Sequence, residues 1–171
     1  MTAPSPTVTF KGTPLTLSGP LPAVGTPAPA FTVLGNDLAP AGLDAFRGRP
    51  LVLLSVPSLD TPVCDTEVRR FNAAATQLAP DVAVAVISMD LPFAQARWCG
   101  ANGIARVQSF SDHRDAAFGQ AFGVLIREWR LLARAVFVVD RGGTLRYSEL
   151  LPELTREPDY AAALQAVAAV R

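Results

Sequence analysis

The residues best suited to chemistry in this chain are gathered in the stretch VPSLDTPVC, residues 56–64. Thr61 followed by Pro62 predicts the start of a helix, because threonine is a good N-cap and proline at the first helical position loses no useful N–H group. Cys64 is then the third helical residue, where the free N–H groups and the dipole of the first turn stabilise an anion. The spacing therefore predicts a reactive thiolate at Cys64.

The same helix, expected over residues 62–78, allows a second interpretation of this cysteine. One apolar stripe follows the 4-3-4-3 spacing of a helix face. Its members are Cys64, Val68, Phe71, Ala75 and Leu78. A free cysteine on such a stripe also fits plain core packing, since cysteine is among the most buried residue types. Position alone leaves both interpretations open, and the Thr-Pro start favours reactivity.

The second cysteine, Cys99, lies in RWCGANG, where Gly100 and the Asn-Gly pair predict the end of a helix. A helix C-terminus disfavours an anion, so if the two thiols divide the labour we expect Cys64 to attack first and Cys99 later. The alternative is a buried structural thiol beside Trp98. The chain has no C-x-x-C motif, and two cysteines with one histidine cannot form a zinc site without carboxylates.

Two other side chains are candidates for a functional role. Arg134 opens the apolar strand ARAVFVVD, residues 133–140, and a cation at that border is placed to hold a thiolate or an oxygen-rich substrate. A strand-end arginine that extends its charge to solvent is the commoner case, and both interpretations stay open. His113, the one histidine, follows Asp112 in a predicted loop and is expected to face solvent. No G-x-S-x-G, P-loop or H-E-x-x-H motif supports a hydrolase or an NTPase.

Strand and helix signals alternate from residue 50 onward, which predicts an α/β fold. Continuous apolar runs predict strands that are buried on both faces, and the turn at residues 140–143 predicts a hairpin. The expected strands cover residues 31–34, 51–56, 82–88, 107–111, 133–140 and 144–150, and the expected helices cover residues 62–78, 92–101, 114–122 and 159–170. This order predicts a mixed β-sheet covered by helices on both faces.

The N-terminal part, residues 7–25, differs in character from the rest. TVTF and LTLS alternate apolar and polar residues around KGTP, which predicts a β-hairpin. A Pro-rich connector, GPLPAVGTPAPA, follows and predicts extended chain with turns. The length of 171 residues favours one domain over residues 1–171.

Composition excludes several classes of function. The chain carries 15 basic and 15 acidic residues, so its formal net charge is zero, and without a basic stripe we expect no nucleic-acid binding. The apolar windows are far shorter than the ~20 residues that span a bilayer, so no membrane segment is expected. MTAPSPTVTF lacks the features of a secretory signal. The sequence therefore predicts a cytoplasmic protein.

Residues 57–64, PSLDTPVC, match the signature P-x-x-x-T-x-x-C of the peroxiredoxin family, which the chain resembles from about residue 7 onward. Four further stretches resemble the bacterial atypical two-cysteine branch of that family. They are VTFKGTPLTL, SMDLPFAQARWCG, ARAVFVVD and EPDYAAAL. The resemblance implies a thioredoxin-like fold, a mixed β-sheet flanked by helices, with an N-terminal β-hairpin extension.

The resemblance also implies a role for each matching residue. Cys64 corresponds to the peroxidatic cysteine and Cys99 to the resolving cysteine. Thr61 is expected to hydrogen-bond the thiolate and the peroxide, and Arg134 to keep Cys64 ionised and polarise the O–O bond. Pro57 is expected to shape the loop and shield the sulfur. No metal or other cofactor is implied.

The activity implied by the resemblance is thiol-dependent reduction of hydrogen peroxide and organic hydroperoxides. Cys64 would form a sulfenic acid and then an intramolecular disulfide with Cys99, which thioredoxin would reduce in a homodimeric enzyme. A disulfide needs Cα atoms within ~7 Å. If the two helices hold the thiols further apart in the reduced protein, as the resemblance implies, the first turn after Thr61 is expected to unwind. A one-cysteine peroxidase, a peroxide-sensing redox switch and an inert thioredoxin-like scaffold remain as alternatives.

Overall fold

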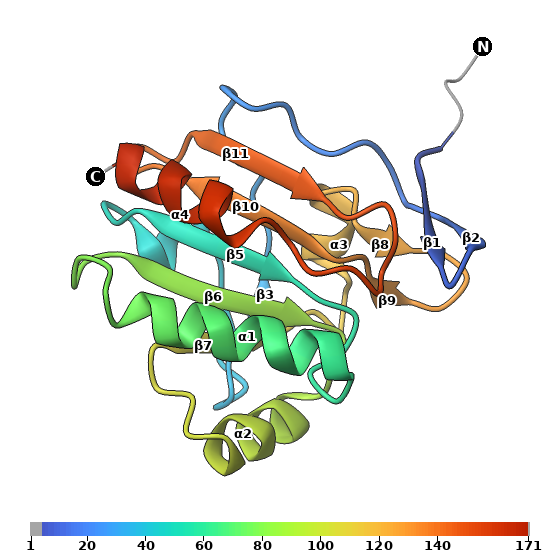
Figure 1. Ribbon diagram of the computed structural model, residues 1–171, viewed down its shortest axis with the longest axis horizontal. Helices are drawn as coiled ribbons and strands as arrows, with labels where there is room; N and C mark the ends of the chain where they lie inside the picture. The colour runs from blue at the N-terminus through green and yellow to red at the C-terminus, as the bar shows by residue number, and fades with distance from the viewer. Residues whose placement is uncertain (1–4, 171) are drawn as a thin grey trace.

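A seven-stranded mixed sheet forms the centre of the molecule in the computed structural model, which describes residues 5–170 (Figure 1). The strand order is β11-β10-β5-β6-β7-β3-β4. The strands are β3 (Val33–Leu34), β4 (Pro40–Ala41), β5 (Leu51–Ser55), β6 (Ala83–Ser88), β7 (Val107–Ser111), β10 (Ala135–Val139) and β11 (Leu145–Leu150). β5 pairs in parallel with β6, and β6 with β7, whereas the other pairs are antiparallel.

Helices α1 (Pro62–Ala75) and α4 (Tyr160–Ala169) cover one face of this sheet (Figure 1). Alternate strand residues such as Val52 and Leu54 point to this face, because successive side chains of a strand alternate between faces. Helix α2 (Pro92–Ala101) packs beside β7, and its Trp98 joins the same apolar cluster. Both faces of the central strands are thus covered, which explains why β5 and β6 are continuous apolar runs.

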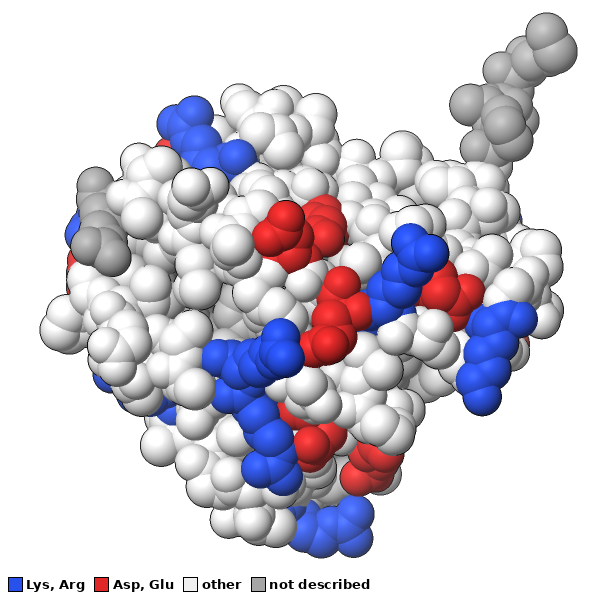
Figure 2. Space-filling view, viewed as in Figure 1, with Lys and Arg blue, Asp and Glu red and all other residues white. Residues whose placement is uncertain are grey.

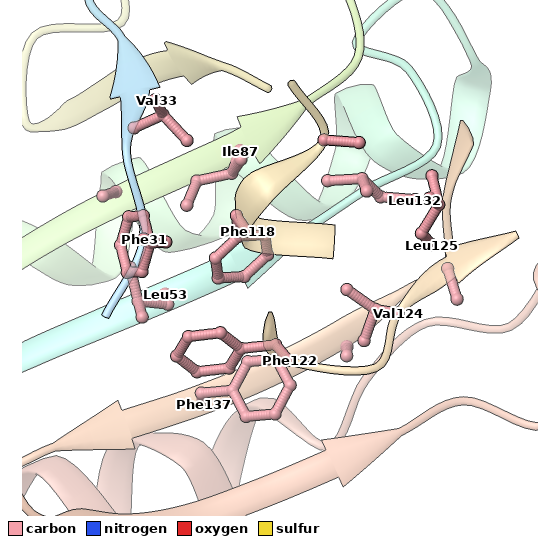
Figure 3. Close-up of a cluster of buried hydrophobic side chains, with 14 of the residues drawn as sticks. Phe31, Val33, Leu53, Ile87, Phe118, Phe122, Val124, Leu125, Leu132 and Phe137 are labelled. Atoms are coloured by element: carbon pink, nitrogen blue, oxygen red, sulfur yellow. The ribbon is translucent and has the colours of Figure 1, made fainter. Parts of the chain in front are cut away.

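An aromatic cluster covers the opposite face of the sheet (Figure 3). The short helix α3 (Ala117–Ala121) brings Phe118 onto this face, where its ring stacks on Phe122 at a centroid distance of 4.6 Å. Phe122 in turn meets Phe137 of β10 edge to face at 4.9 Å. The 3₁₀ helix η1 (Leu43–Phe46) adds Phe46 to the same core.

Two small hairpins lie apart from the main sheet. Strands β1 (Thr7–Phe10) and β2 (Thr13–Thr16) form the predicted N-terminal hairpin, and Lys11 and Gly12 between them both have positive φ. That conformation matches the tight turns that suit hairpin twist. A second pair, β8 (Leu125–Ile126) with β9 (Leu131–Leu132), packs beside it. The sequence did not predict this second pair.

The predicted fold class is confirmed, with adjustments at the ends of individual elements. Helix α1 ends at Ala75 rather than at residue 78, and α3 covers five residues rather than the expected 114–122. The helix over residues 92–101 and the hairpin around residues 140–143 form as predicted. Strand β2 begins at Thr13, two residues before the expected LTLS.

The surface of the viewed face mixes the two signs of charge, with acidic and basic side chains interspersed (Figure 2). Within residues 5–170, no helix is long and apolar enough to cross a membrane. The same residues contain no group of three or more His, Cys, Asp or Glu side chains that could hold a metal ion.

Candidate active site

Cys64 lies in the first turn of α1, which begins just beyond the carboxyl end of β5. Thr61 is the N-cap residue, with extended backbone, and Pro62 opens the helix as predicted. The Thr61 hydroxyl does not cap a backbone N–H group. It lies 2.7 Å from the Cys64 sulfur and 2.8 Å from the carbonyl of Ser58, so its single hydrogen has two possible acceptors. The hydroxyl is therefore free to follow the charge on the sulfur.

Arg134 directly precedes β10, the strand next to β5, and its side chain contacts the same sulfur. Its side chain is only 2% exposed, and Nη1 lies 3.3 Å from Cys64 Sγ. Nε and Nη2 both donate to the carbonyl of Leu154, at 3.0 and 2.9 Å. The interpretation of Arg134 as a strand end that extends to solvent is thereby excluded. Instead, the guanidinium is a fixed cation beside a buried thiol.

Glu67 completes this buried cluster, and the sequence did not single it out. Its Oε2 accepts a hydrogen bond from Arg134 Nη1 at 2.6 Å, and neither side chain reaches solvent appreciably. Burial raises the pKa of Glu67 from 4.5 to about 7, against the lowering effect of Arg134. Burial alone would lower the pKa of Arg134, but Cys64 and Glu67 outweigh it and raise that pKa. The sequence signal that could have identified Glu67 is its position, since it is a carboxylate three residues after Cys64 on an apolar helix face.

An apolar pocket of about 390 Å³ opens beside the sulfur. Two of its lining residues, Thr61 and Arg134, are the residues that contact Cys64. The other lining residues are Phe10, Lys11, Pro57, Pro62, Val63, Trp129, Leu131, Leu154 and Thr155. The pocket is thus built from the loop before α1, the N-terminal hairpin, the β8–β9 hairpin and the segment after β11.

The N-terminal hairpin is fixed to the rim of this pocket by Glu153. Its carboxylate accepts hydrogen bonds from the Thr9 hydroxyl and from the backbone N–H groups of Lys11 and Gly12. The next residue, Leu154, donates its backbone N–H to the carbonyl of Thr9 while its own carbonyl holds Arg134. One segment therefore positions both the pocket wall and the cation.

Cys99 lies near the C-terminus of α2, in a different environment. Its thiol is partly exposed, and its sulfur has one polar neighbour, the Ser109 hydroxyl, at 3.6 Å. Burial raises the pKa of Cys99, and the Ser109 hydroxyl opposes that effect weakly. Both cysteines are free thiols. Cys64 belongs to the apolar cluster on the face of the sheet that α1 and α4 cover, and Cys99 packs against that cluster.

The structure brings four of the five predicted site residues together: Pro57, Thr61, Cys64 and Arg134 share the pocket or the sulfur. Cys99 stands apart from this group. His113 was expected to face solvent, but it is half-buried, with Nδ1 at 2.9 Å from the Ser111 hydroxyl. The correction follows from its place at the end of β7, where the chain turns back toward the core.

The fold and the site together define a class of protein. In this class a mixed sheet carries a buried cysteine at a helix N-terminus, and a threonine and an arginine contact its sulfur. The sequence model of the Redoxin family matches residues 23–164, and the chain belongs to that family. A solved structure described as a peroxiredoxin-like protein from Aquifex aeolicus superposes with a TM-score of 0.90 at 40% identity, covering 99% of this chain and all of that one.

Curated relatives indicate which branch of the family the chain resembles. The chain is 52% identical to a thiol peroxidase from Bacillus subtilis, over 95% of this chain and 97% of that protein. It is 55% identical to a thiol peroxidase from Oceanobacillus iheyensis, over 92% and 95% of the two chains. The resemblance to the peroxiredoxins is confirmed, and the relatives place the chain in the thiol peroxidase branch.

Proposed function

We propose that this thiol peroxidase uses Cys64 as the nucleophile that reduces hydroperoxides. The observation that supports it most is the Cys64 sulfur, held between the Thr61 hydroxyl at 2.7 Å and Arg134 Nη1 at 3.3 Å. The thiolate attacks one peroxide oxygen, an S–O bond forms and the O–O bond breaks. The second oxygen leaves with a proton as water or an alcohol, and the sulfur becomes a sulfenic acid.

Three sets of donors stabilise the charge that moves along S–O–O during this step. The Thr61 hydroxyl can turn from Ser58 toward the sulfur or the arriving oxygen. Arg134 is held rigid by Leu154 and Glu67, so little reorganisation is needed when charge develops. The free N–H groups of the first turn of α1 add a favourable dipole.

The shape and walls of the pocket support organic hydroperoxides as substrates beside hydrogen peroxide. The pocket opens on Thr61 and Arg134 and is otherwise lined mainly by apolar and aromatic side chains such as Trp129 and Leu131. An alkyl or aryl group can be buried there while the peroxide end meets the two polar residues. Burial of apolar surface contributes roughly 25 cal/mol per Å², so a larger organic group should bind more tightly.

We propose Cys99 as the resolving cysteine. Its thiol attacks the sulfenic sulfur of Cys64, an S–S bond forms, and the hydroxyl leaves with a proton as water. Since a disulfide needs Cα atoms within ~7 Å, we expect the turn that starts at Thr61 to unwind in this step. Cys64 is fully buried in the reduced form, which supports a need for such a movement.

The resemblance to the atypical two-cysteine branch supports three further parts of the proposal. Thioredoxin would reduce the disulfide by thiol–disulfide exchange, which returns both thiols. Two copies of the chain would form a homodimer. A cytoplasmic location fits this cycle, because a reducing compartment keeps the resting thiols free.

The test is steady-state peroxide consumption with thioredoxin, thioredoxin reductase and NADPH. We expect many turnovers by the wild type, none by Cys64→Ser, and arrest after about one equivalent by Cys99→Ser, which keeps the nucleophile but lacks the resolving thiol. Consumption of only one equivalent by the wild type would support a peroxide-sensing switch instead. Full turnover by Cys99→Ser would support a one-cysteine peroxidase.

A further inference from the structure

A second polar cluster lies between the segment before Cys64 and the helix that carries Cys99. Its centre is Asp90, which follows β6 and comes just before α2. Asp90 Oδ1 accepts a hydrogen bond from the Ser58 hydroxyl at 2.7 Å. Oδ2 accepts from the backbone N–H of Leu59 at 2.8 Å and from the Ser88 hydroxyl at 2.7 Å. The carboxylate therefore fastens two consecutive residues of the active-site loop to the end of β6.

The hydrogen bonds continue from Asp90 into α2. The side-chain amide of Gln95 donates to the Ser88 hydroxyl at 2.9 Å and to the carbonyl of Phe110 at 2.8 Å. Gln95 and Ser88 have no exposed surface, so these bonds are shielded from water. Gln95 lies one helical turn before Cys99. A continuous path of hydrogen bonds thus joins the loop of one cysteine to the helix of the other.

The same path reaches the Cys64 sulfur through Ser58. The carbonyl of Ser58 accepts from the backbone N–H of Thr61 at 3.1 Å and lies 2.8 Å from its hydroxyl. That hydroxyl is also the one at 2.7 Å from the sulfur. Asp90 therefore holds Ser58 in place, and the Ser58 carbonyl is one of the two acceptors within reach of the Thr61 hydroxyl. The parallel strands β5 and β6 end at the same edge of the sheet, which places these residues together (Figure 1).

We propose that Asp90 is a positioning residue with opposite effects on the two chemical steps. It holds the loop at residues 58–61 in the geometry that reduces peroxide, and it must release this loop before Cys64 can reach Cys99. Asp90 contacts neither cysteine and acts only through Ser58 and Leu59. The inference rests on the proposed roles of Cys64 and Cys99. The inference adds Asp90 as the side chain that sets the rate of Cys64 oxidation relative to the rate of disulfide formation.

Loss of the Ser58–Asp90 bond should slow the first step and speed the second. One hydrogen bond changes the equilibrium between the held and the released loop by a factor of about three to ten. The Ser58→Ala variant should therefore oxidise Cys64 about threefold to tenfold more slowly and form the disulfide faster by a similar factor. Asp90→Asn, which keeps the size but loses the charge and one acceptor, should shift both rates in the same directions and further. A simple loss of packing would slow both steps together.

The measurement is rapid quenching of the reduced full-length protein after mixing with hydrogen peroxide, followed by intact mass. The thiol, the sulfenic acid (about 16 mass units heavier) and the disulfide (about two lighter) are separate species, so each step gets its own rate. Thr76→Ala is the matched control. Thr76 also donates its hydroxyl to a backbone carbonyl, that of Ala73, but it lies at the opposite end of α1 and outside the Asp90 cluster, so both of its rates should stay within about twofold of the wild type.

Opposite changes in the two rates for Ser58→Ala, with Thr76→Ala near the wild type, support the proposal. Equal slowing of both steps, no change in either, or the same changes in Thr76→Ala would overturn it. If Asp90→Asn does not fold, Ser58→Ala still decides, because it removes only one hydroxyl at a half-buried position. Failure of the proposed function is distinct: the wild type itself would then form no sulfenic acid or no disulfide.

Discussion

The two cysteines share one face of the sheet, yet their surroundings differ in almost every respect that matters for reactivity. Cys64 is fully buried and has a hydroxyl at 2.7 Å and a guanidinium at 3.3 Å. Cys99 is partly exposed, and one hydroxyl at 3.6 Å is its polar neighbour. Two hydrogen-bond donors therefore face the Cys64 sulfur, whereas burial raises the pKa of Cys99.

The difference originates in where each residue sits on its helix. Cys64 occupies the first turn of α1, toward which backbone N–H groups point. Cys99 occupies the last turn of α2, at the negative end of the helix dipole. The comparison teaches that helix polarity and one buried arginine give two identical side chains on one face of the sheet different electrostatic surroundings.

The largest expected effect is the removal of the Cys64 sulfur. Cys64→Ser should lower the rate of peroxide reduction by more than about 10³-fold, since a hydroxyl at this site is a far weaker nucleophile. Cys99→Ser should leave the first oxidation of Cys64 within about threefold of the wild type. Stopped-flow oxidation of the reduced variants measures both values. Equal loss in the two variants would contradict the division of roles.

Removal of the cation should come next in size. Arg134→Met should slow the oxidation of Cys64 by about 10²–10³-fold, as expected for one preorganised electrostatic donor. It also leaves Glu67 buried without a partner, which should lower the free energy of unfolding by about 3–5 kcal/mol. Urea unfolding and stopped-flow kinetics measure the two effects.

The matched control for Arg134 replaces both members of the buried pair. Arg134→Met combined with Glu67→Leu should recover much of the stability, because no unpaired charge remains in the core. Its reaction rate should stay low, because the cation beside Cys64 is still absent. Recovery of the rate together with the stability would show that Arg134 acts on the fold alone.

A pH dependence of stability follows from Glu67. Burial raises the pKa of the Glu67 carboxyl from its ordinary value of 4.5 to about 7. The native protein therefore binds the carboxyl proton more tightly than the unfolded chain does. The contribution of Glu67 to the free energy of unfolding should therefore be greatest below pH 4.5 and decrease as the pH rises to about 7. Urea unfolding of the wild type and of Glu67→Gln, measured between pH 4.5 and about 7, isolates the contribution of Glu67 to the free energy of unfolding. Parallel pH profiles for the two proteins would contradict the assignment.

The smallest effect should come from the polar neighbour of Cys99. Ser109→Ala removes a contact of 3.6 Å to a thiol, which is a weak hydrogen-bonding group, so disulfide formation should change by less than about threefold. Thr61→Val, which removes the 2.7 Å hydroxyl beside Cys64, is the corresponding change at the other thiol and should be much more damaging. Comparable effects from the two substitutions, in rapid-quench experiments, would remove the asymmetry between the sites.

Local signals in the sequence predicted Cys64 and its helix well. Thr61 and Pro62 mark the helix start by their own conformational preferences, and the apolar stripe that includes Phe71 faces the core as expected. The strands were predictable for the same reason, since β5 and β6 are buried on both faces and need continuous apolar residues.

The parts that could not be predicted depend on contacts between distant segments. Arg134 and Glu67 are far apart in the sequence, and only the fold shows that they meet. The carbonyl of Leu154 is a main-chain group that any residue would provide. Strands β8 and β9 contain two residues each, too few to show a period. Asp90 gave no signal either, because its partners come from three separate segments.

The central claim is that Cys64 is oxidised first and Cys99 resolves it within the same chain. The most direct test is a free-thiol count with intact mass, before and after one equivalent of cumene hydroperoxide. We predict the loss of two thiols and about two mass units, with no dimer band on a non-reducing gel. Loss of one thiol with a gain of one or two oxygens would contradict the role of Cys99, and two untouched thiols would contradict the claim as a whole.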